Sequence, residues 1–361
     1  MNKAYKFRIY PNEEQKVLLA KTFGCVRFIY NKMLGDKIAH YETTKQKLNN
    51  TPAQYKAQFE WLKEVDSMAL CNAQMNLQTA YNNFFRSPKV GFPKYKSKHR
   101  SKASYTTNFI NGNIKLLDNI LKLPKVGFIK IKKHRQIPND YLLKSVTVSQ
   151  TASGKYYASI LFEYEEQIRQ VKANQVVGLD FSMKELFVSS DGEFAAYPRF
   201  YRRALNKLIR EQRKLSKCQK GSNNRNKQRI KVARLHEKVA NQRKDFLHKT
   251  SRQITNAYDA VCIEDLNMQG MSQALNFGKS VADNGWGMFI AFLAYKLLEQ
   301  GKQLVKIDKW FPSSKTCSCC GKVKDSLSLA ERTYHCECGF VCDRDINAAI
   351  NIRNQGLLQL A

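Results

Sequence analysis

Alternation of apolar and polar residues marks the beginning and the middle of the chain. Residues 3–10 alternate as a β-strand does, and Pro11 ends the run. Residues 105–165 contain further short alternating segments, with turn signals at Asn111-Gly112 and at Ser153-Gly154. We therefore predict a small β-barrel, to which the strand over residues 3–10 also belongs.

A helical pattern separates the first strand from the others. Asn12 is the predicted N-cap of a helix, and Gln15 is its capping-box partner. The helical spacing is interrupted once, at residues 49–52, and the aromatic residues of the first helix are expected in the helical core. The predicted domains are a barrel made of residues 1–12 and 87–170 and a helical insertion made of residues 13–86.

The second half of the chain predicts one further domain, residues 171–361. It opens with three strands in an antiparallel meander, with Asp191-Gly192 as a hairpin turn. Next comes a helical hairpin, residues 201–254, and after it strands and helices alternate. This order of elements resembles the ribonuclease-H-like fold. The weakly patterned stretch 267–285 is a candidate lid loop. The predicted strands cover residues 176–181, 186–190, 193–196, 260–264 and 303–307, and a helix covers residues 286–300.

The charge of the chain restricts the partners that it can have. Lys and Arg number 61 against 30 Asp and Glu, a formal net charge of +31. Such a charge repels itself unless a polyanion neutralises it, and phosphate contacts by Lys and Arg supply most non-specific affinity for nucleic acid. An anionic membrane surface is the competing partner. Because no run of 18 uncharged apolar residues and no secretion signal occurs, we expect nucleic acid rather than a membrane, and a cytoplasmic location.

Two basic segments are the candidate nucleic-acid contacts. Residues 92–105 interleave basic with aromatic residues, a composition that holds phosphates and stacks bases. Residues 201–254 contain eighteen basic and only three acidic residues. A solvated loop and a solvated helix face are the alternatives, but this charge favours a nucleic-acid channel and a barrel of the oligonucleotide-binding kind. The candidate contacts are Lys94, Tyr95, Lys96, Lys98, Arg100, Arg202, Arg203, Arg210 and Arg213.

Three acids that lie far apart in the sequence are the candidate catalytic residues. Asp180 and Glu264 each end an apolar run, the pattern of a buried strand with a carboxylate at its end. Asp345 opens a helix whose small residues allow close packing. Carboxylates that meet can hold two Mg²⁺ ions for phosphodiester hydrolysis, and without cations they would repel one another. Asp265 and Asp343 are alternatives, although Asp265 would face the other side of its strand and Asp343 would precede the helix.

Six of the ten cysteines lie in one stretch, residues 317–342, which is typical of a metal site in a reducing compartment. They include two knuckles, C-S-C-C and C-E-C, each followed by glycine and separated by fifteen residues, a spacing that fits a four-cysteine zinc ribbon over residues 312–342. The second knuckle is C-x-C where C-x-x-C is usual, so His335 in place of Cys336 is an open alternative. The predicted zinc ligands are Cys317, Cys320, Cys336 and Cys338, with Cys319 and Cys342 left over.

Four motifs of the chain carry a resemblance to a known family: Gly178-Leu-Asp180-Phe-Ser-Met-Lys, Val261-Cys-Ile-Glu264-Asp-Leu-Asn-Met-Gln-Gly-Met, Ser314-Lys-Thr-Cys317-Ser-Cys-Cys320-Gly and Asp343-Arg-Asp345-Ile-Asn347-Ala-Ala. Together they resemble the motifs of the TnpB proteins. The loop Gly91-Phe-Pro-Lys-Tyr-Lys-Ser-Lys resembles the N-terminal half of that family as well, so the likeness covers nearly the whole chain. TnpB proteins are transposon-encoded, RNA-guided DNA endonucleases, similar to the ancestors of type V CRISPR effectors.

The resemblance implies an α+β multidomain protein: a wedge β-barrel with a helical recognition insertion, then an RNase H-like RuvC nuclease domain with an embedded zinc ribbon. It implies that Asp180, Glu264 and Asp345 are the catalytic acids, with two Mg²⁺ ions and a structural Zn²⁺ as cofactors. It also implies a guide RNA from the transposon end and a double-stranded DNA target beside a short transposon-adjacent motif. The protein would be a monomer on its RNA in a prokaryotic cytoplasm, associated with the nucleoid when bound to DNA. The C-x-C knuckle departs from the family's pattern.

Three other functions stay open at this point. An RNA-guided repressor that binds DNA without cutting would be expected to lack one of the acids, and this sequence keeps all three. An RNase H-like transposase that joins DNA ends would use the same fold and acids, although a zinc ribbon before the last acid argues against it. A basic zinc-ribbon transcription factor would explain the charge and the cysteines but would give the acids no role.

Overall fold

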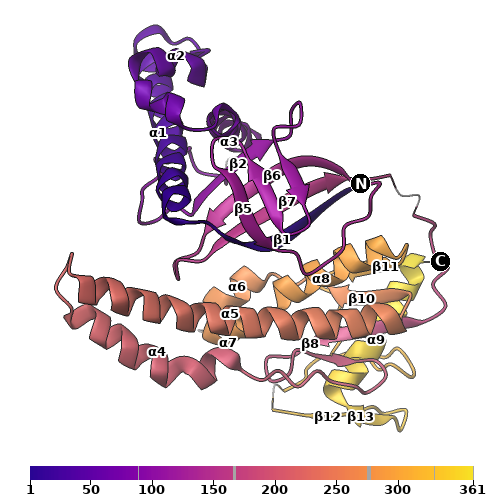
Figure 1. Cartoon of the computed structure of the whole chain (residues 1–361). Helices are drawn as coiled ribbons and strands as arrows, with labels where there is room; N and C mark the ends of the chain where they lie inside the picture. Colours follow the sequence, from indigo (N-terminus) through magenta and orange to yellow (C-terminus); the bar gives the residue numbers. More distant parts are fainter. Residues whose placement is uncertain (88, 166–167, 275–277, 329, 361) are drawn as a thin grey trace. The chain divides into compact units, whose positions relative to one another are not determined.

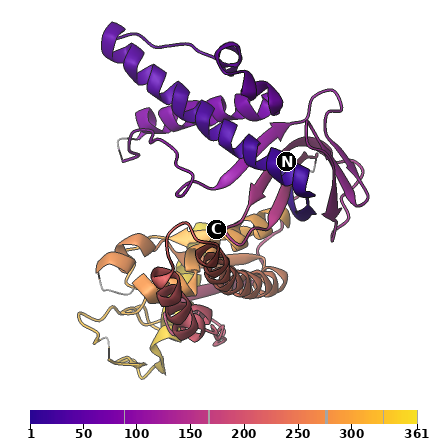
Figure 2. The ribbon, with the colours of Figure 1, turned by 60° about the vertical axis from the view of Figure 1, so that its left-hand side comes forward.

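The structure is a computed structural model of the 361-residue chain. The residues that it describes are 1–87, 89–165, 168–274, 278–328 and 330–360. The chain forms two compact units, Met1–Glu166 and Gln167–Ala361, so the division lies four residues before the predicted one. Figures 1 and 2 show the elements of each unit in the colours of the sequence. In the described part of the chain, no helix has both the length and the apolar character that a membrane crossing needs.

The first unit contains a seven-stranded sheet in which all neighbouring strands are antiparallel. The order is β2-β6-β7-β1-β5-β4-β3. Ser153-Gly154 joins β6 to β7 as a hairpin, which confirms that prediction. The strands are β1 (Asn2–Tyr10), β2 (Ala103–Asn108), β3 (Lys115–Leu117), β4 (Ile120–Leu123), β5 (Gly127–Lys132), β6 (Leu142–Gln150) and β7 (Tyr156–Glu163).

The predicted hairpin at Asn111-Gly112 is wrong, although the turn itself forms. The amide of Asn113 donates to the carbonyl of Ile110, and both turn residues have positive φ. The flanking strands β2 and β3, however, occupy opposite ends of the sheet. The chain from residue 108 to residue 115 can span at most about 25 Å, whereas seven strands laid flat would separate their outer members by about 29 Å. The sheet must therefore curl, which supports the predicted barrel, but no ladder joins β2 to β3 among the described residues.

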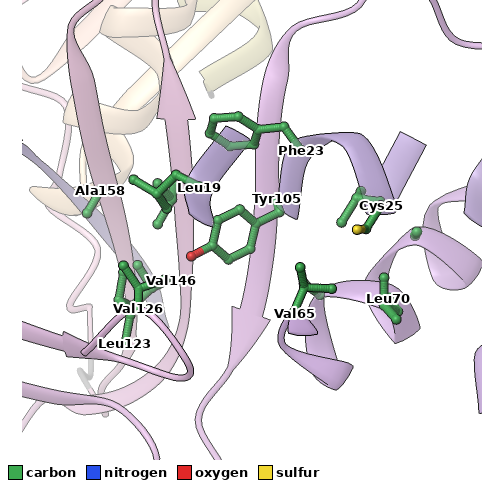
Figure 3. Close-up of a cluster of buried hydrophobic side chains, with 14 of the residues drawn as sticks. Leu19, Phe23, Cys25, Val65, Leu70, Tyr105, Leu123, Val126, Val146 and Ala158 are labelled. Carbon is green, nitrogen blue, oxygen red and sulfur yellow. The ribbon is translucent and has the colours of Figure 1, made fainter. Parts of the chain in front are cut away.

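Helices fill the stretch between β1 and β2. The side chain of Asn12 accepts from the amide of Gln15, and the Gln15 side chain accepts from the amide of Asn12, so the predicted capping box is present. Figure 3 shows the contact with the sheet, where Tyr105 of β2 lies beside Phe23, with ring centroids 5.9 Å apart. The helices are α1 (Glu13–Thr44), α2 (Pro52–Gln58), the 3₁₀ helix η1 (Glu60–Glu64) and α3 (Ser67–Arg86).

The second unit contains a four-stranded sheet in the order β11-β10-β8-β9. Strand β10 is parallel to both of its neighbours, and β9 is antiparallel to β8. The predicted third strand of the meander, residues 193–196, is wrong, because only one isolated bridge, Val188 to Phe194, forms there. The strands are β8 (Val176–Phe181), β9 (Phe187–Ser189), β10 (Ala260–Glu264) and β11 (Gln303–Ile307), and a separate hairpin consists of β12 (Thr333–His335) and β13 (Val341–Asp343).

Among the residues that the structure describes, six helices accompany this sheet. The predicted lid loop, residues 267–285, is not a plain loop, because two short helices form within it, apart from residues 275–277, which lie outside the described part. The basic hairpin breaks between Lys217 and Asn223. The helices are α4 (Phe200–Lys217), α5 (Asn223–Ala257), α6 (Met268–Ala274), α7 (Gly278–Asn284), α8 (Trp286–Glu299) and α9 (Arg344–Leu360).

Strand alternation divides the residues of the sheet between two layers of helices. Val177 and Leu179 of β8 join the core that contains residues of α5 and α8, such as Leu247 and Leu293. Residues of the opposite parity face α9, where Cys262 of β10 packs in a cluster with Ile352. The sheet therefore lies between α5 and α8 on one side and α9 on the other, as Figure 1 shows.

Candidate active site and zinc site

Two glycines let helix α9 approach the sheet closely. A Cβ atom on Gly178 of β8 would lie 2.0 Å from the carbonyl oxygen of Ala349, and one on Gly356 would lie 2.2 Å from the sulfur of Cys262. Ala348 and Ala349 are completely buried in this contact, as the small residues of the helix predicted. No larger side chain fits at either glycine, because protein interiors are close-packed. The helix therefore lies directly against β8 and β10.

The same alternation brings the predicted acids to one side of the sheet. Asp180 has the parity of Gly178, and Glu264 has the parity of Cys262, so both carboxylates end their strands on the side of α9. Asp345 lies in the first turn of that helix. Asp265 has the other parity and pairs with Lys306 at 2.9 Å, which agrees with the expectation that it faces away.

The electrostatics of Asp180 show that the three acids interact. The pKa of Asp180 is raised well above its ordinary value, first by burial and then by the charges of Glu264 and Asp345. The neighbouring Arg344 acts in the opposite direction. In the described part of the chain, these acids do not form a group with all ligand oxygens within 4.8 Å of one another. A pair of ions needs no such group, because each ion can be shared by only some of the carboxylates.

Specific neighbours hold the other two acids. Burial raises the pKa of Glu264, while the hydroxyl of Ser313 donates to its Oε1 and acts in the opposite direction. Asp345 is 27% exposed and accepts from Arg344 at 3.2 Å. Asp343 has a different position, because its carboxylate accepts from the amides of Asp345 and Ile346 and so caps α9. The sequence had placed Asp343 before the helix.

The four predicted zinc ligands come together in the structure. The sulfurs of Cys317 and Cys338 are 3.8 Å apart, and those of Cys320 and Cys336 are 3.6 Å apart. A tetrahedral zinc site with Zn–S bonds of about 2.3 Å places its sulfurs about 3.8 Å apart, so the donors fit the ion. The ligand atoms of these four cysteines all lie within 4.8 Å of one another. In the described residues, no other group of three or more His, Cys, Asp or Glu comes as close together, so His335, Cys319 and Cys342 do not belong to the site.

The backbone around each knuckle has the conformation that its glycine permits. Gly321 and Gly339 have φ of 77° and 86°, a region that residues with a Cβ atom rarely adopt. The amide of Gly321 donates to the carbonyl of Cys317, and the amide of Gly339 donates to that of Cys336. The hairpin β12–β13 carries the second knuckle at its turn. The four thiols therefore connect this hairpin to the first knuckle and complete the ribbon.

Two asparagines of α9 hold the segment that leads into the zinc ribbon. The amide of Asn351 donates to the carbonyls of Ser313 and Thr316, at 2.8 and 2.6 Å. The amide of Asn347 also donates to the carbonyl of Thr316, and its oxygen accepts from the amide of Ser318. The helix that carries Asp345 therefore fixes Ser313, which in turn contacts Glu264. Sequence reasoning missed this role of the three residues, although Asn347 lies in a motif that it had quoted.

If the three acids hold Mg²⁺ for cutting DNA, as the sequence predicts, the Ser313→Ala variant should cut about 10- to 100-fold more slowly, because residues that orient a metal ligand usually contribute that much. The variant should also need more Mg²⁺ for its half-maximal rate, since one Glu264 oxygen loses its fixed partner. Ser313→Thr should restore most of the rate, and Ser314→Ala is the matched control. Single-turnover rates at several Mg²⁺ concentrations measure both effects. An unchanged Mg²⁺ requirement in Ser313→Ala would contradict this role.

The predicted basic contacts of the first unit lie on a loop that is fastened to α1. Asn31 exchanges two hydrogen bonds of 2.8 Å with the backbone of Lys96. The ammonium group of Lys96 lies 3.8 Å from the ring centroid of Tyr30, and burial lowers its pKa. Lys96 is therefore partly committed to this contact. Exposed to solvent are Lys94, Tyr95, Lys98 and Arg100.

The basic hairpin of the second unit is held together by one buried acid. Glu211 of α4 is 1% exposed and binds Lys231 of α5 at 3.0 Å, and Gln228 and Lys231 lower its pKa to about 2. Arg210 and Arg213 line a surface hollow of about 470 Å³ together with further basic residues of α4. The predicted contacts Arg202, Arg203, Arg210 and Arg213 are all exposed on this helix.

A junction that the sequence did not reveal connects the hairpin to β8. Asp283, 3% exposed, accepts from the amides of Tyr201 and Arg202 at the start of α4. The neighbouring Asn284 donates to the carbonyls of Ser182 and Glu185, which follow β8. The end of the predicted lid segment therefore joins the start of the basic hairpin to the strand that carries Asp180.

Three regions of the chain match known domain families. Residues 159–275 match the family described as a probable transposase, and residues 286–352 match the TNB domain of Cas12f1-like proteins. Residues 1–46 match a helix-turn-helix domain, but the structure there consists of the strand β1 and the single long helix α1. The first two matches together contain all three acids and all four clustered cysteines.

Comparisons with whole proteins extend this likeness along the chain. A Cas12f1 chain, solved by cryo-electron microscopy in a complex with sgRNA and target DNA, aligns with a TM-score of 0.62 over 98% of this chain and 99% of that chain. The sequence identity there is 14%, so the alignment shows the fold. A protein of Streptomyces pristinaespiralis that is named as an RNA-guided DNA endonuclease is 36% identical, over 99% of this chain and 90% of the relative.

Two further relatives support the same family, and the second of them carries its name. InsQ of Escherichia coli K12, also named as an RNA-guided DNA endonuclease, is 30% identical over 99% of this chain and 93% of its own length. A TnpB-like protein of Acanthamoeba polyphaga mimivirus is 25% identical over 98% of this chain and 73% of its own length. By a likeness that runs along nearly its whole length, the chain belongs to the TnpB family.

Proposed function

We propose that this chain is a transposon-encoded, Mg²⁺-dependent, RNA-guided DNA endonuclease. The observation that carries the proposal is the arrangement of Asp180, Glu264 and Asp345, which end two adjacent strands and begin the helix packed on them. Burial and then the charges of Glu264 and Asp345 raise the pKa of Asp180, and a bound cation would relieve the repulsion between these acids. The relatives named as RNA-guided DNA endonucleases support the same activity.

In this proposal the three acids hold two Mg²⁺ ions. When bound, the ions supply a nucleophilic water and stabilise the leaving oxygen of the phosphodiester. The residues of this chain place the ligands: Ser313 fixes one oxygen of Glu264, and Asp343 caps the helix that presents Asp345. Arg344 compensates part of the negative charge of the cluster. The four cysteines would hold a structural Zn²⁺ that keeps the adjoining segment in place.

The rest of the chain would hold the nucleic acids. The first unit would be a wedge barrel with the helical recognition insertion, and the second a RuvC-like nuclease domain. Base pairing with a guide RNA from the transposon end would choose the double-stranded target, while the protein reads a short flanking motif and the shape of the heteroduplex. The exposed basic residues of the loop 92–105 and of α4 supply charge for phosphate contacts.

The test is to purify the protein from cells that carry its transposon, sequence the RNA that copurifies, and offer DNA that matches its variable end. We expect cutting that needs both the match and Mg²⁺. Binding of matched DNA without any cutting would instead favour a repressor, and joined DNA ends would favour a transposase.

A further inference from the structure

An aromatic pocket in the helical part of the first unit has no role in the function proposed so far. It encloses about 600 Å³ between the C-terminal halves of α1 and α3, a volume within the range of small-ligand sites. Five aromatic rings line it, far more than a solvated helix surface needs. They belong to Tyr41, Tyr81, Phe84, Phe85 and Phe92.

Three of these rings are open to solvent. Phe85 is 75% exposed, Tyr41 is 57% exposed and Phe92 is 43% exposed, so they are not part of the core. Tyr81 fixes two of the rings, because it stacks on Phe85 with a centroid distance of 6.3 Å and meets Phe92 edge-on at 5.6 Å. Exposed aromatic surface of this extent marks a binding site more often than chance exposure.

The rim of the pocket is mainly cationic. Lys37 and Lys47 both line it, and burial together with the charge of Lys47 lowers the pKa of Lys37. Lys45 lies 5.7 Å from the ring centroid of Tyr41. Glu42 is the one acid among the residues that line the pocket. The pocket therefore suits a ligand that carries a phosphate beside a planar ring. The lysines at the rim attract the phosphate, and the aromatic side chains stack on the planar ring.

We infer that this pocket binds an unpaired nucleobase of the guide RNA, stacked against Phe85 and Phe92 with its phosphate at the lysine rim. Gln78 and Asn82 offer amide groups for the polar edge of the base, and Glu42 can accept from an exocyclic amine. Stacking on aromatic side chains is how proteins hold unpaired bases. The inference rests on the proposed function, in which RNA stays bound throughout the cycle, whereas DNA is unpaired only transiently. A preformed pocket suits the permanent ligand.

The experiment uses the full chain freed of cellular RNA and a single-stranded RNA of roughly twelve nucleotides with 2-aminopurine at its centre. The wild type should quench the fluorescence of the probe on binding. Phe85→Ala should bind the RNA about tenfold more weakly and quench it little, because the substitution removes one stacking surface. Phe85→Trp should retain both the affinity and the quenching, since tryptophan also stacks on bases. Phe128→Ala is the matched control, since Phe128 is 59% exposed on β5 and lies outside the pocket.

Equal quenching by Phe85→Ala and the wild type would overturn the inference, as would equal loss in Phe128→Ala. Tighter binding of a DNA probe of the same sequence would show that RNA is the wrong occupant. Guided cutting of matched DNA by the wild type, measured in parallel, separates the two proposals. If the wild type cuts matched DNA but Phe85→Ala quenches the probe as the wild type does, only the proposed base-binding pocket is rejected. If quenching depends on Phe85 but the wild type does not cut, only the proposed endonuclease activity is rejected.

Discussion

Asp180→Asn should abolish cutting of matched DNA and should raise the melting temperature of the metal-free protein. A bound cation contributes several kcal/mol of charge stabilisation to phosphodiester hydrolysis, and about 4 kcal/mol corresponds to a thousandfold loss of rate. The stability gain arises because the ionised Asp180 is buried beside Glu264 and Asp345. Guide RNA binding should not change, since the substitution removes a charge and preserves the shape of the side chain.

The sign of the pH dependence follows from the same interactions. The pKa of Asp180 in the folded protein lies above its value of about 3.9 in an unfolded chain, so ionisation at neutral pH destabilises the metal-free fold. That penalty is complete above the raised folded-state pKa, shrinks as the pH falls below it, where Asp180 becomes protonated in the folded protein, and is gone below the unfolded-state pKa. The protonated carboxyl no longer binds a cation, so the cutting rate should fall over the same pH interval, and additional Mg²⁺ should move the fall to lower pH.

Asp265→Asn is the matched control for this prediction. Asp265 follows Glu264 directly, but it faces the other way and pairs with Lys306. The variant should cut at nearly the rate of the wild type. Thermal melting with and without Mg²⁺, together with single-turnover cleavage, measures all of these effects. Undiminished cutting by Asp180→Asn would remove that residue from the metal site, and an Mg²⁺-induced rise in melting temperature that survives the substitution would do the same.

Cys317→Ser should lose the zinc and, with it, most of the cutting activity. Structural zinc in small modules contributes roughly 10–16 kcal/mol to folding, and Cys317 is the buried ligand of the four. The loss should spread to the active site, because the segment from Ser313 to Ser318 is fixed between the ribbon and the two asparagines of α9. Once the ribbon is unfolded, Ser313 no longer has a fixed position beside Glu264.

Cys319→Ser is a control two residues away in the same knuckle. Its side chain is exposed and lies outside the group of four sulfurs. We expect Cys319→Ser to keep about one zinc per chain and normal cutting, whereas Cys317→Ser should keep little of either. Zinc content, measured by elemental analysis of the purified proteins, is independent of activity. Full zinc occupancy in Cys317→Ser, or zinc loss in Cys319→Ser, would show that the ligand set is wrong.

The sequence predicted those features that depend on local patterns. The capping box at Asn12 and Gln15, the hairpin at Ser153-Gly154 and the parity of Asp265 follow from a few neighbouring residues, and all are present. The cysteine spacing also sufficed for the zinc ligands, because the four cysteines of the two predicted knuckles are the ones whose sulfurs come together. The carboxylates at the strand ends were predictable because parallel neighbouring strands end at the same edge of a sheet.

Features that depend on distant partners were not predictable in this way. The turn at Asn111-Gly112 forms as its residues require, but the pairing of β2 and β3 is decided by strands that lie elsewhere in the chain. The predicted strand over residues 193–196 has too few ladder partners and is reduced to one bridge. Ser313 and Asn351 are ordinary polar residues in the sequence, and only the folded chain shows which groups they contact.

The most direct test of the central claim is to locate divalent cations by anomalous diffraction from crystals of the protein–RNA–DNA complex that contain Mn²⁺ in place of Mg²⁺. Asp180, Glu264 and Asp345 should surround two anomalous peaks close to the scissile phosphate. Absence of any peak between these carboxylates in a complex that still holds intact DNA, or peaks held by other residues, would contradict the assignment of the three acids as the cutting site.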